Sequence, residues 1–188
     1  QNTTGVSAIS ESAPDFLNAQ LKAVFTDIVP DAVKIGMVSS KLLIEVIAEA
    51  LNVYQAKNIV LDPVMVSTSG SRLIEDDAAK MLMDKLMVIA DIITPNIPET
   101  EVITGMRVSD AQSMESAAIK MYQDIKNKGG HAAVLVKGGH SVHTASDCLC
   151  IDGQIHWLRA ERIDNPNTHG TGCTLSSAIA ANLALGCD

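Results

Sequence analysis

The chain has 188 residues, 47% of them hydrophobic and 19% charged, which is typical of a globular protein and excludes a disordered one. Its formal net charge of −8 argues against nucleic acid as a partner. No apolar run is long enough to span a bilayer and we find no signal peptide, so we expect no membrane partner. The four cysteines lack zinc-binding or C-x-x-C spacing, which favours reduced thiols and a cytoplasmic location.

Apolar residues repeat at helical and strand periods along most of the chain. The first half predicts, in order, a helix over Pro14–Ile28, a strand over Asp31–Met37, a helix after Ser40, a strand over Ile59–Val64 and a methionine-rich helix over Asp76–Ile89. The second half predicts a strand over Ile92–Asn96, helices over Pro98–Thr104 and Asp110–Lys128, a strand over Ala132–Lys137, a hairpin of Asp147–Ile151 with Gln154–Leu158, and a final helix.

Strands and helices therefore alternate through most of the sequence. This order predicts an α/β fold with a mostly parallel sheet, helices on both faces in three layers, and a small antiparallel portion near the end. No internal repeat, linker or low-complexity segment divides the chain, so we expect one domain over residues 1–188.

A glycine loop runs directly into the final predicted helix. Gly170, Thr171, Gly172 and Cys173 lie where backbone N–H groups at a helix N-terminus have no intrahelical partner and the helix dipole is positive. Such a loop binds anions, most often phosphate, and stabilises a thiolate in its first turn. The alternative is a glycine-rich connection with a structural thiol. The loop is neither a Walker A motif nor a dinucleotide-binding fingerprint.

Polar residues follow the predicted parallel strands at their carboxyl ends, where ligands bind in open α/β sheets. Asp62 and Glu99 are oxygen ligands suited to Mg²⁺, while Asn96 and Lys137 can hold phosphate oxygens. The alternative for Asn96 and Glu99, three residues apart before a helix, is a capping box. Lys137 could equally be a solvated strand end. The convergence of these strand ends with the glycine loop is a stronger signal than any single motif.

Five segments together resemble the hydroxymethylpyrimidine-phosphate kinases of thiamine synthesis, which belong to the ribokinase-like superfamily. They are residues 31–37, 60–65, 94–99, 134–140 and 168–180, the last of which carries a cysteine at position 173 where most ribokinase relatives have aspartate. The resemblance covers essentially the whole chain. The chain lacks the segments that match the family's opening strand and its final helix and strand, so we expect it to be truncated at both ends.

The resemblance implies roles for individual residues. It makes Gly170, Thr171 and Gly172 the anion hole, places Cys173 at the catalytic position, and gives Asn96 and Glu99 the family's phosphate and Mg²⁺ motif with Asp62 on the same rim. The positions that match the family's pyrimidine site are Gln1, Met37 and Val64. It also implies ATP and Mg²⁺ as cofactors, with Lys137 among the nucleotide-binding residues, and a homodimer.

The function expected from this resemblance is ATP- and Mg²⁺-dependent phosphorylation of 4-amino-5-hydroxymethyl-2-methylpyrimidine, its monophosphate, or both. The same motifs permit a pyridoxal or pyridoxine kinase. A third alternative of a different class is a catalytically inert module of the same fold that senses a ligand.

Overall fold

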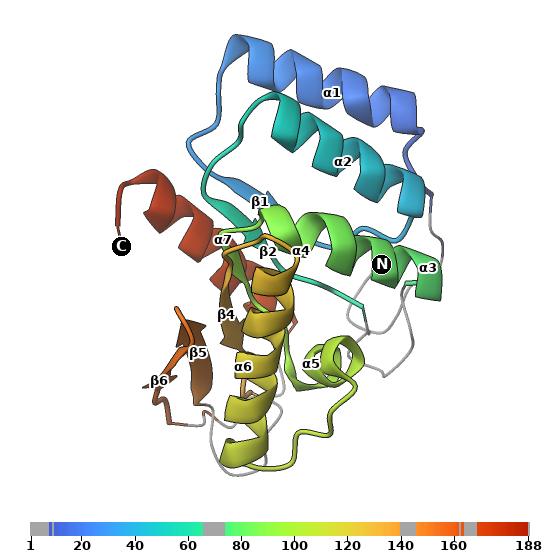
Figure 1. The fold of residues 1–188 in the computed structure, drawn as a ribbon. Coiled ribbons are helices and arrows are strands. Elements are labelled where there is room, and N and C mark those ends of the chain that lie inside the picture. Colours follow the sequence, from blue (N-terminus) through green and yellow to red (C-terminus); the bar gives the residue numbers. More distant parts are fainter. Residues whose placement is uncertain are drawn as a thin grey trace.

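A six-stranded sheet forms the centre of the structure, a computed structural model that describes residues 8, 10–65, 74–139, 146–161, 163 and 169–187. The strand order follows the sequence (Figure 1). Its strands are β1 (Val33–Ile35), β2 (Ile59–Leu61), β3 (Ile92–Ile93), β4 (Ala133–Val136), β5 (Asp147–Ile151) and β6 (Gln154–Leu158). Strands β1 to β4 are parallel, and β5 and β6 continue the sheet antiparallel to β4.

Helices lie on both faces of this sheet. They are α1 (Pro14–Asp27), α2 (Lys41–Val53), α3 (Asp76–Met81), α4 (Met87–Ile89), α5 (Ile97–Thr104), α6 (Ala111–Asn127) and α7 (Thr171–Ala184), with a π-helical turn at Leu82–Leu86 between α3 and α4. None of the helices in the described part of the chain is long and apolar enough to cross a bilayer.

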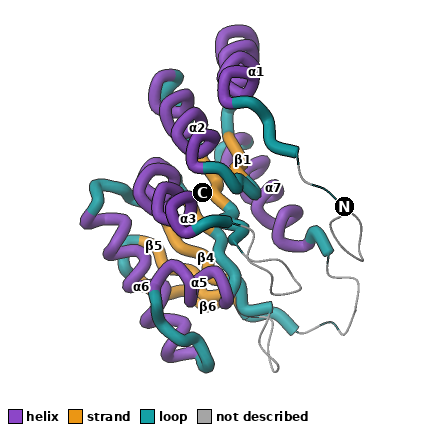
Figure 2. Tube along the Cα trace, turned by 90° about the vertical axis from the view of Figure 1, so that its right-hand side faces the viewer, coloured by secondary structure: helices purple, strands orange, loops and turns teal. Residues whose placement is uncertain are grey.

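The connections between the parallel strands explain how the helices are distributed. Each crossover from β1 to β4 moves the chain one strand in the same direction, and right-handed crossovers of that kind leave their helices on one face. Helix α7 follows the antiparallel hairpin and packs on β1 and β2 from the opposite side (Figures 1 and 2). The predicted three-layer α/β class is thus confirmed.

The core lies between the sheet and the crossover helices. Leu82, Leu86, Ile93, Met121 and Val134 are completely or almost completely buried there. The methionine-rich segment predicted as one helix is α3, the π-helical turn and α4 in succession, and its apolar residues fill this core as expected. A π-helical turn inserts one residue into the helical repeat, which apolar periodicity does not reveal.

The parallel strands are shorter than their apolar patterns predict. The backbone N–H of Asp62 still bonds to the carbonyl of Ile35 and that of Thr94 to the carbonyl of Leu61, each at 2.9 Å. Pro63 and Pro95 come next, and proline has no N–H to continue the ladder. Strands β2 and β3 therefore end just before these prolines, and Asp62 and Thr94 lie at the rim of the sheet. Beyond Pro95, one further contact to β4 remains, in which the Pro95 carbonyl accepts from the N–H of Lys137 at 2.8 Å.

The hairpin prediction is confirmed residue for residue. Strands β5 and β6 have the expected limits, and they pair with Ile151 opposite Gln154. Asp152 and Gly153 both have positive φ, at 51° and 77°, as the central residues of a tight right-twisted hairpin turn require.

Candidate active site at the carboxyl ends of the strands

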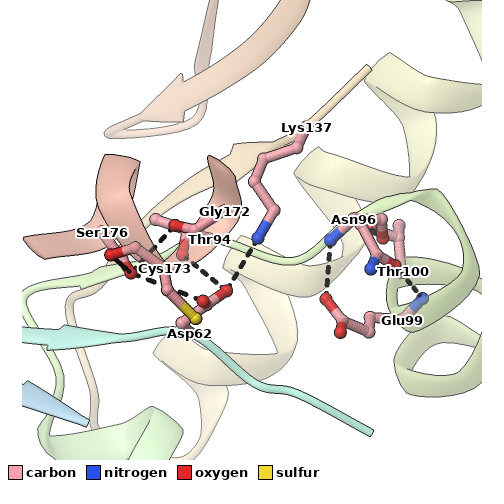
Figure 3. Close-up of polar contacts among 9 residues, drawn as sticks. All are labelled: Asp62, Thr94, Asn96, Glu99, Thr100, Lys137, Gly172, Cys173 and Ser176. Carbon is pink, nitrogen blue, oxygen red and sulfur yellow. Dashed lines mark hydrogen bonds and ion pairs between the residues drawn. The ribbon is translucent and has the colours of Figure 1, made fainter. Parts of the chain in front are cut away.

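A buried ion pair joins the ends of β2 and β4. The Nζ atom of Lys137 lies 2.7 Å from Oδ1 of Asp62, and their side chains are 15% and 2% exposed (Figure 3). Burying two charges is favourable only where they compensate each other and are further hydrogen-bonded. The prediction that both residues lie on one rim is confirmed by this contact, and Lys137 is not the solvated strand end considered as its alternative.

Two buried hydroxyl groups also face the carboxylate of Asp62. Thr94, at the end of β3, donates to Oδ1 over 3.3 Å, and Ser176, on α7, lies 3.4 Å from Oδ2. Both residues are fully buried. The sequence suggests no specific role for either residue, because a threonine before a proline and a serine within a helix are common in purely structural roles. Their positions in the sequence could have indicated that they lie near the rim, because Thr94 follows a strand and Ser176 lies one helical turn beyond Gly172.

Asn96 and Glu99 form the capping box that the sequence offered as their structural alternative. The Asn96 side chain accepts from the N–H of Glu99, and Oε2 of Glu99 accepts from the N–H of Asn96, both at 2.8 Å. The same geometry fixes Glu99 beside the rim, because Asn96 forms a parallel bridge with Lys137 beyond the end of β4. Capping and ligand binding are therefore compatible roles for this pair.

The carboxyl group of Glu99 has an abnormal pKa. Its side chain is almost fully buried, and this desolvation raises the pKa from 4.5 to about 7, against the opposing effects of the Asn96 N–H and the Lys137 charge. The nearby negative charge of Asp62 raises it further. A carboxyl group that titrates near neutrality would be ionised more readily by a bound cation, so Glu99 is suited to a site that takes up positive charge.

The glycine loop reaches the same rim. Gly170 is the N-cap of α7 with φ of 82°, a left-handed conformation that strains other residues. Gly172 is so close to Lys137 that a β-carbon built on it would lie 3.2 Å from Nζ. Cys173, the next residue in the first helical turn, is exposed. The expected meeting of the loop with the strand ends is thus confirmed, whereas the chemical roles of Gly170, Thr171, Gly172 and Cys173 stay predictions.

The residues expected to contact a pyrimidine are less well defined by the structure. Met37 follows β1 with an exposed fraction of 47%, and Val64 follows β2 and is half-buried. Gln1 lies outside the described residues. An open hollow lies along α5 and the segment that follows it, lined by Ile97, Glu101, Gly105, Met106, Arg107, Val108 and Ser109.

The donor set fits a magnesium ion only in part. No group of three or more His, Cys, Asp and Glu side chains gathers in the described residues, so they hold no cage built of protein ligands alone. Mg²⁺ differs from most metals here, because it keeps several waters and is commonly bound by one or two carboxylates plus substrate phosphates. Asp62 and Glu99, on the rim that the first turn of α7 reaches, match that pattern of ligands.

The chain is similar to a family of known kinases. The family described as phosphomethylpyrimidine kinase matches residues 1–188. The hydroxymethylpyrimidine/phosphomethylpyrimidine kinase of Rhizobium meliloti is 43% identical over 187 residues, which cover 99% of this chain and 68% of that protein. The thiamine biosynthesis bifunctional protein ThiED of Geobacter sulfurreducens is 44% identical over 187 residues, and the chain spans 99% of its own length but 37% of that protein.

Solved structures agree with the sequence relatives. The phosphomethylpyrimidine kinase of Clostridium difficile 630 matches with a TM-score of 0.84 at 41% identity, over 100% of this chain and 75% of that one. The ADP complex of Bacillus subtilis pyridoxal kinase matches with a TM-score of 0.85 at 34% identity, over 96% of this chain and 66% of that one.

The fold is that of the ribokinase-like kinases, as the sequence predicted. Within that class, the chain belongs to the phosphomethylpyrimidine kinase family. Pyridoxal kinases share the fold, but the matching ones are less similar in sequence than the phosphomethylpyrimidine kinases.

The raised pKa of Glu99 predicts how stability depends on pH. Because the folded chain holds this proton more tightly than the unfolded chain, the free energy of unfolding should fall as pH rises from 4.5 to 7. The loss should reach about 3 kcal/mol at most, from roughly 2.5 pKa units. Glu99→Gln keeps the cap and removes the charge, so it should abolish this contribution and be the more stable protein at pH 8.

Urea unfolding of both proteins from pH 4 to pH 8 measures the difference. Glu49→Gln, which removes an exposed carboxylate on α2, serves as the control. Parallel stability curves for Glu99→Gln and the unaltered chain would show that Glu99 is ionised at neutral pH in the folded protein.

The contact between Gly172 and Lys137 predicts a separation of stability from activity. Gly172→Ala should keep or raise the free energy of unfolding, by up to about 1 kcal/mol, because alanine favours helices. Its methyl group must displace the lysine amine by a few tenths of an ångström, so phosphate transfer should slow at least several-fold.

Gly139→Ala provides the comparison, since nothing lies within 4 Å of the position that a β-carbon would take there. The measurements are the steady-state turnover and the free energy of unfolding in urea for both variants. Normal turnover by Gly172→Ala would mean that the position of the Lys137 amine is unimportant for the reaction.

Proposed function

We propose that this chain transfers the γ-phosphate of ATP to 4-amino-5-hydroxymethyl-2-methylpyrimidine, to its monophosphate, or to both, in a Mg²⁺-dependent reaction. The observation that carries the proposal is the meeting of Lys137 and Asp62 with the first turn of α7 at the rim of the sheet. The family membership and the names of the relatives, which include a thiamine biosynthesis protein, support the choice of substrate.

The acceptor oxygen of the pyrimidine attacks the γ-phosphorus in line, and ADP leaves. The N–H groups in the first turn of α7 are directed to the charge on the transferring phosphoryl group, an arrangement worth about 10²- to 10³-fold in rate for one such donor. Lys137 adds a positive charge beside Gly172, where the amine can follow the phosphate oxygens. Little covalent chemistry is needed from the protein, because positioning and charge stabilisation dominate phosphoryl transfer.

Cys173 is proposed to hold or accept the proton of the acceptor oxygen. It is exposed in the first turn of α7, on the element that supplies the anion site. A covalent phosphocysteine is not required, because direct transfer needs one displacement and a phosphocysteine needs two.

Asp62 and Glu99 are the residues proposed to hold Mg²⁺, directly or through water. When bound, the ion would neutralise charge on the nucleotide phosphates. Asn96 and Lys137 then complete the nucleotide-phosphate site, while Met37 and Val64 offer apolar contacts to the flat ring at the ends of β1 and β2.

The setting of the enzyme is part of the same proposal. The free thiols of Cys148, Cys150, Cys173 and Cys187 support a reducing, cytoplasmic location. A homodimer is expected from the family resemblance alone.

A coupled ADP-release assay with the pyrimidine alcohol, its monophosphate and pyridoxal tests the function. We expect turnover on one or both pyrimidines and little on pyridoxal. Turnover mainly on pyridoxal would establish the pyridoxal kinase instead. Tight pyrimidine binding in calorimetry without ADP release would support the inert sensing module.

The four cysteines make an internal test of the role of Cys173. Cys148 and Cys150 are fully buried, and burial raises the pKa of Cys148 to about 12, so both should react slowly with iodoacetamide. Cys173 and Cys187 are both exposed, but only Cys173 lies at the N-terminus of α7, beside the proposed phosphate site. We expect Cys173 to be alkylated first, and ATP should protect it without protecting Cys187.

Substitution of Cys173 then tests whether the thiol takes part in the reaction, which its alkylation alone does not show. Cys173→Ala should lower turnover by roughly 10²- to 10⁴-fold if the thiol acts as a base, with little change in nucleotide affinity. Cys173→Asp should retain part of the activity, and Cys187→Ala should retain all of it. Normal turnover by Cys173→Ala would make the thiol structural and leave the reaction to the anion site.

A further inference from the structure

The hydroxyl group of Ser176 links the anion-binding end of α7 to the carboxylate of Asp62. Its Oγ atom lies 3.4 Å from Oδ2 of Asp62, 3.1 Å from the carbonyl oxygen of Gly172 and 3.2 Å from that of Cys173 (Figure 3). Ser176 is fully buried and Asp62 almost so. No role in the proposed reaction has yet required this side chain.

The two oxygens of Asp62 have different partners within the described part of the chain. Oδ1 receives the Lys137 amine at 2.7 Å and the Thr94 hydroxyl at 3.3 Å, whereas Oδ2 faces the Ser176 hydroxyl. Lys137 and Thr94 come from the sheet, so they hold Asp62 relative to β3 and β4. Ser176 alone among these three donors comes from α7.

The hydroxyl has one proton and three acceptors within reach. A hydrogen bond to an ionised carboxylate is roughly twice as strong as one to a neutral carbonyl, so the Asp62 charge competes well with the two shorter helix contacts. The alternative is a helix-internal bond to the carbonyl four residues earlier, a common arrangement for serine that Thr174 makes with Gly170 on the same helix.

We propose that Ser176 is a positioning residue for phosphate transfer, which acts by fixing Oδ2 of Asp62 to the first turn of α7. This inference rests on the proposed function. The reaction needs the α7 amides, Lys137 and Asp62 in one fixed arrangement, and active-site groups must be held within about 0.5 Å of their productive positions. Ser176 supplies the hydrogen bond between the helix and the carboxylate on which that arrangement depends.

A double-mutant cycle with Ser176→Ala and Asp62→Asn tests the coupling, measured on the full chain. Ser176→Ala alone should lower kcat about tenfold, the effect of a lost hydrogen bond to a charged group, and should raise the Mg²⁺ concentration for half-maximal rate. The KM for the pyrimidine should change less than twofold. In the Asp62→Asn background, Ser176→Ala should have almost no further effect, because its partner charge is already gone.

Control variants separate this role from simple packing. Ser177→Ala removes the exposed hydroxyl next along the helix and should leave turnover unchanged. Ser176→Thr keeps a hydroxyl and should restore most of the rate that Ser176→Ala loses. If Ser176→Ala does not fold, as urea unfolding would show, Ser176→Cys takes its place in the cycle, since its thiol is only a weak donor.

The positioning role of Ser176 can be tested even if the proposed function is wrong. Absence of ADP release by the unaltered chain would overturn that function, and the cycle would then be measured as the affinity for Mg²⁺ and ATP in calorimetry. An equal fold-change from Ser176→Ala with aspartate or asparagine at position 62 would overturn the positioning role in either measurement. Full activity of Ser176→Ala would overturn it as well.

Discussion

The ion pair between Lys137 and Asp62 is the contact on which the arrangement of the rim depends. Each charge is costly to bury alone, and removing one partner would leave the other uncompensated. Because the two residues end strands that are separated by β3, the pair fixes the relative positions of β2 and β4 beyond the last ladder hydrogen bonds. It also holds the lysine amine against Gly172, so a structural contact sets the position of the charge that we propose for phosphate binding.

The sequence predicted this rim because strand ends are defined by local chemistry. Asp62 directly follows β2 and Lys137 directly follows β4, while Asn96 follows β3 after Thr94 and Pro95. The sequence also predicted the three layers and the hairpin, since the apolar periodicity and the turn residues determine them. Ser176 could not be found in this way, because its relation to Asp62 spans 114 positions and depends on how α7 packs. The π-helical turn also leaves no mark in the apolar pattern.

Asn96 and Glu99 show that a structural and a functional interpretation of one motif need not compete. The capping box requires hydrogen bonds that satisfy backbone donors at the start of α5. It would form equally well with Glu99 in solvent, where the carboxyl pKa would stay near its ordinary value. Here the cap lies against Asp62 and Lys137, and burial raises that pKa to about 7. The environment, not the motif, therefore gives Glu99 its raised pKa.

The environment also separates the four cysteines, among which the sequence had already singled out Cys173. Strand alternation turns Cys148 and Cys150 toward α6, where desolvation suppresses ionisation of their thiols. Cys173 is exposed in the first turn of α7, which packs on β1 and β2 from the face opposite the crossover helices. A thiol in the first turn of any crossover helix would face a different set of strand ends. The direction from which α7 arrives thus brings an accessible thiol, the glycine amides and the Asp62 carboxylate to one place, which no single motif specifies.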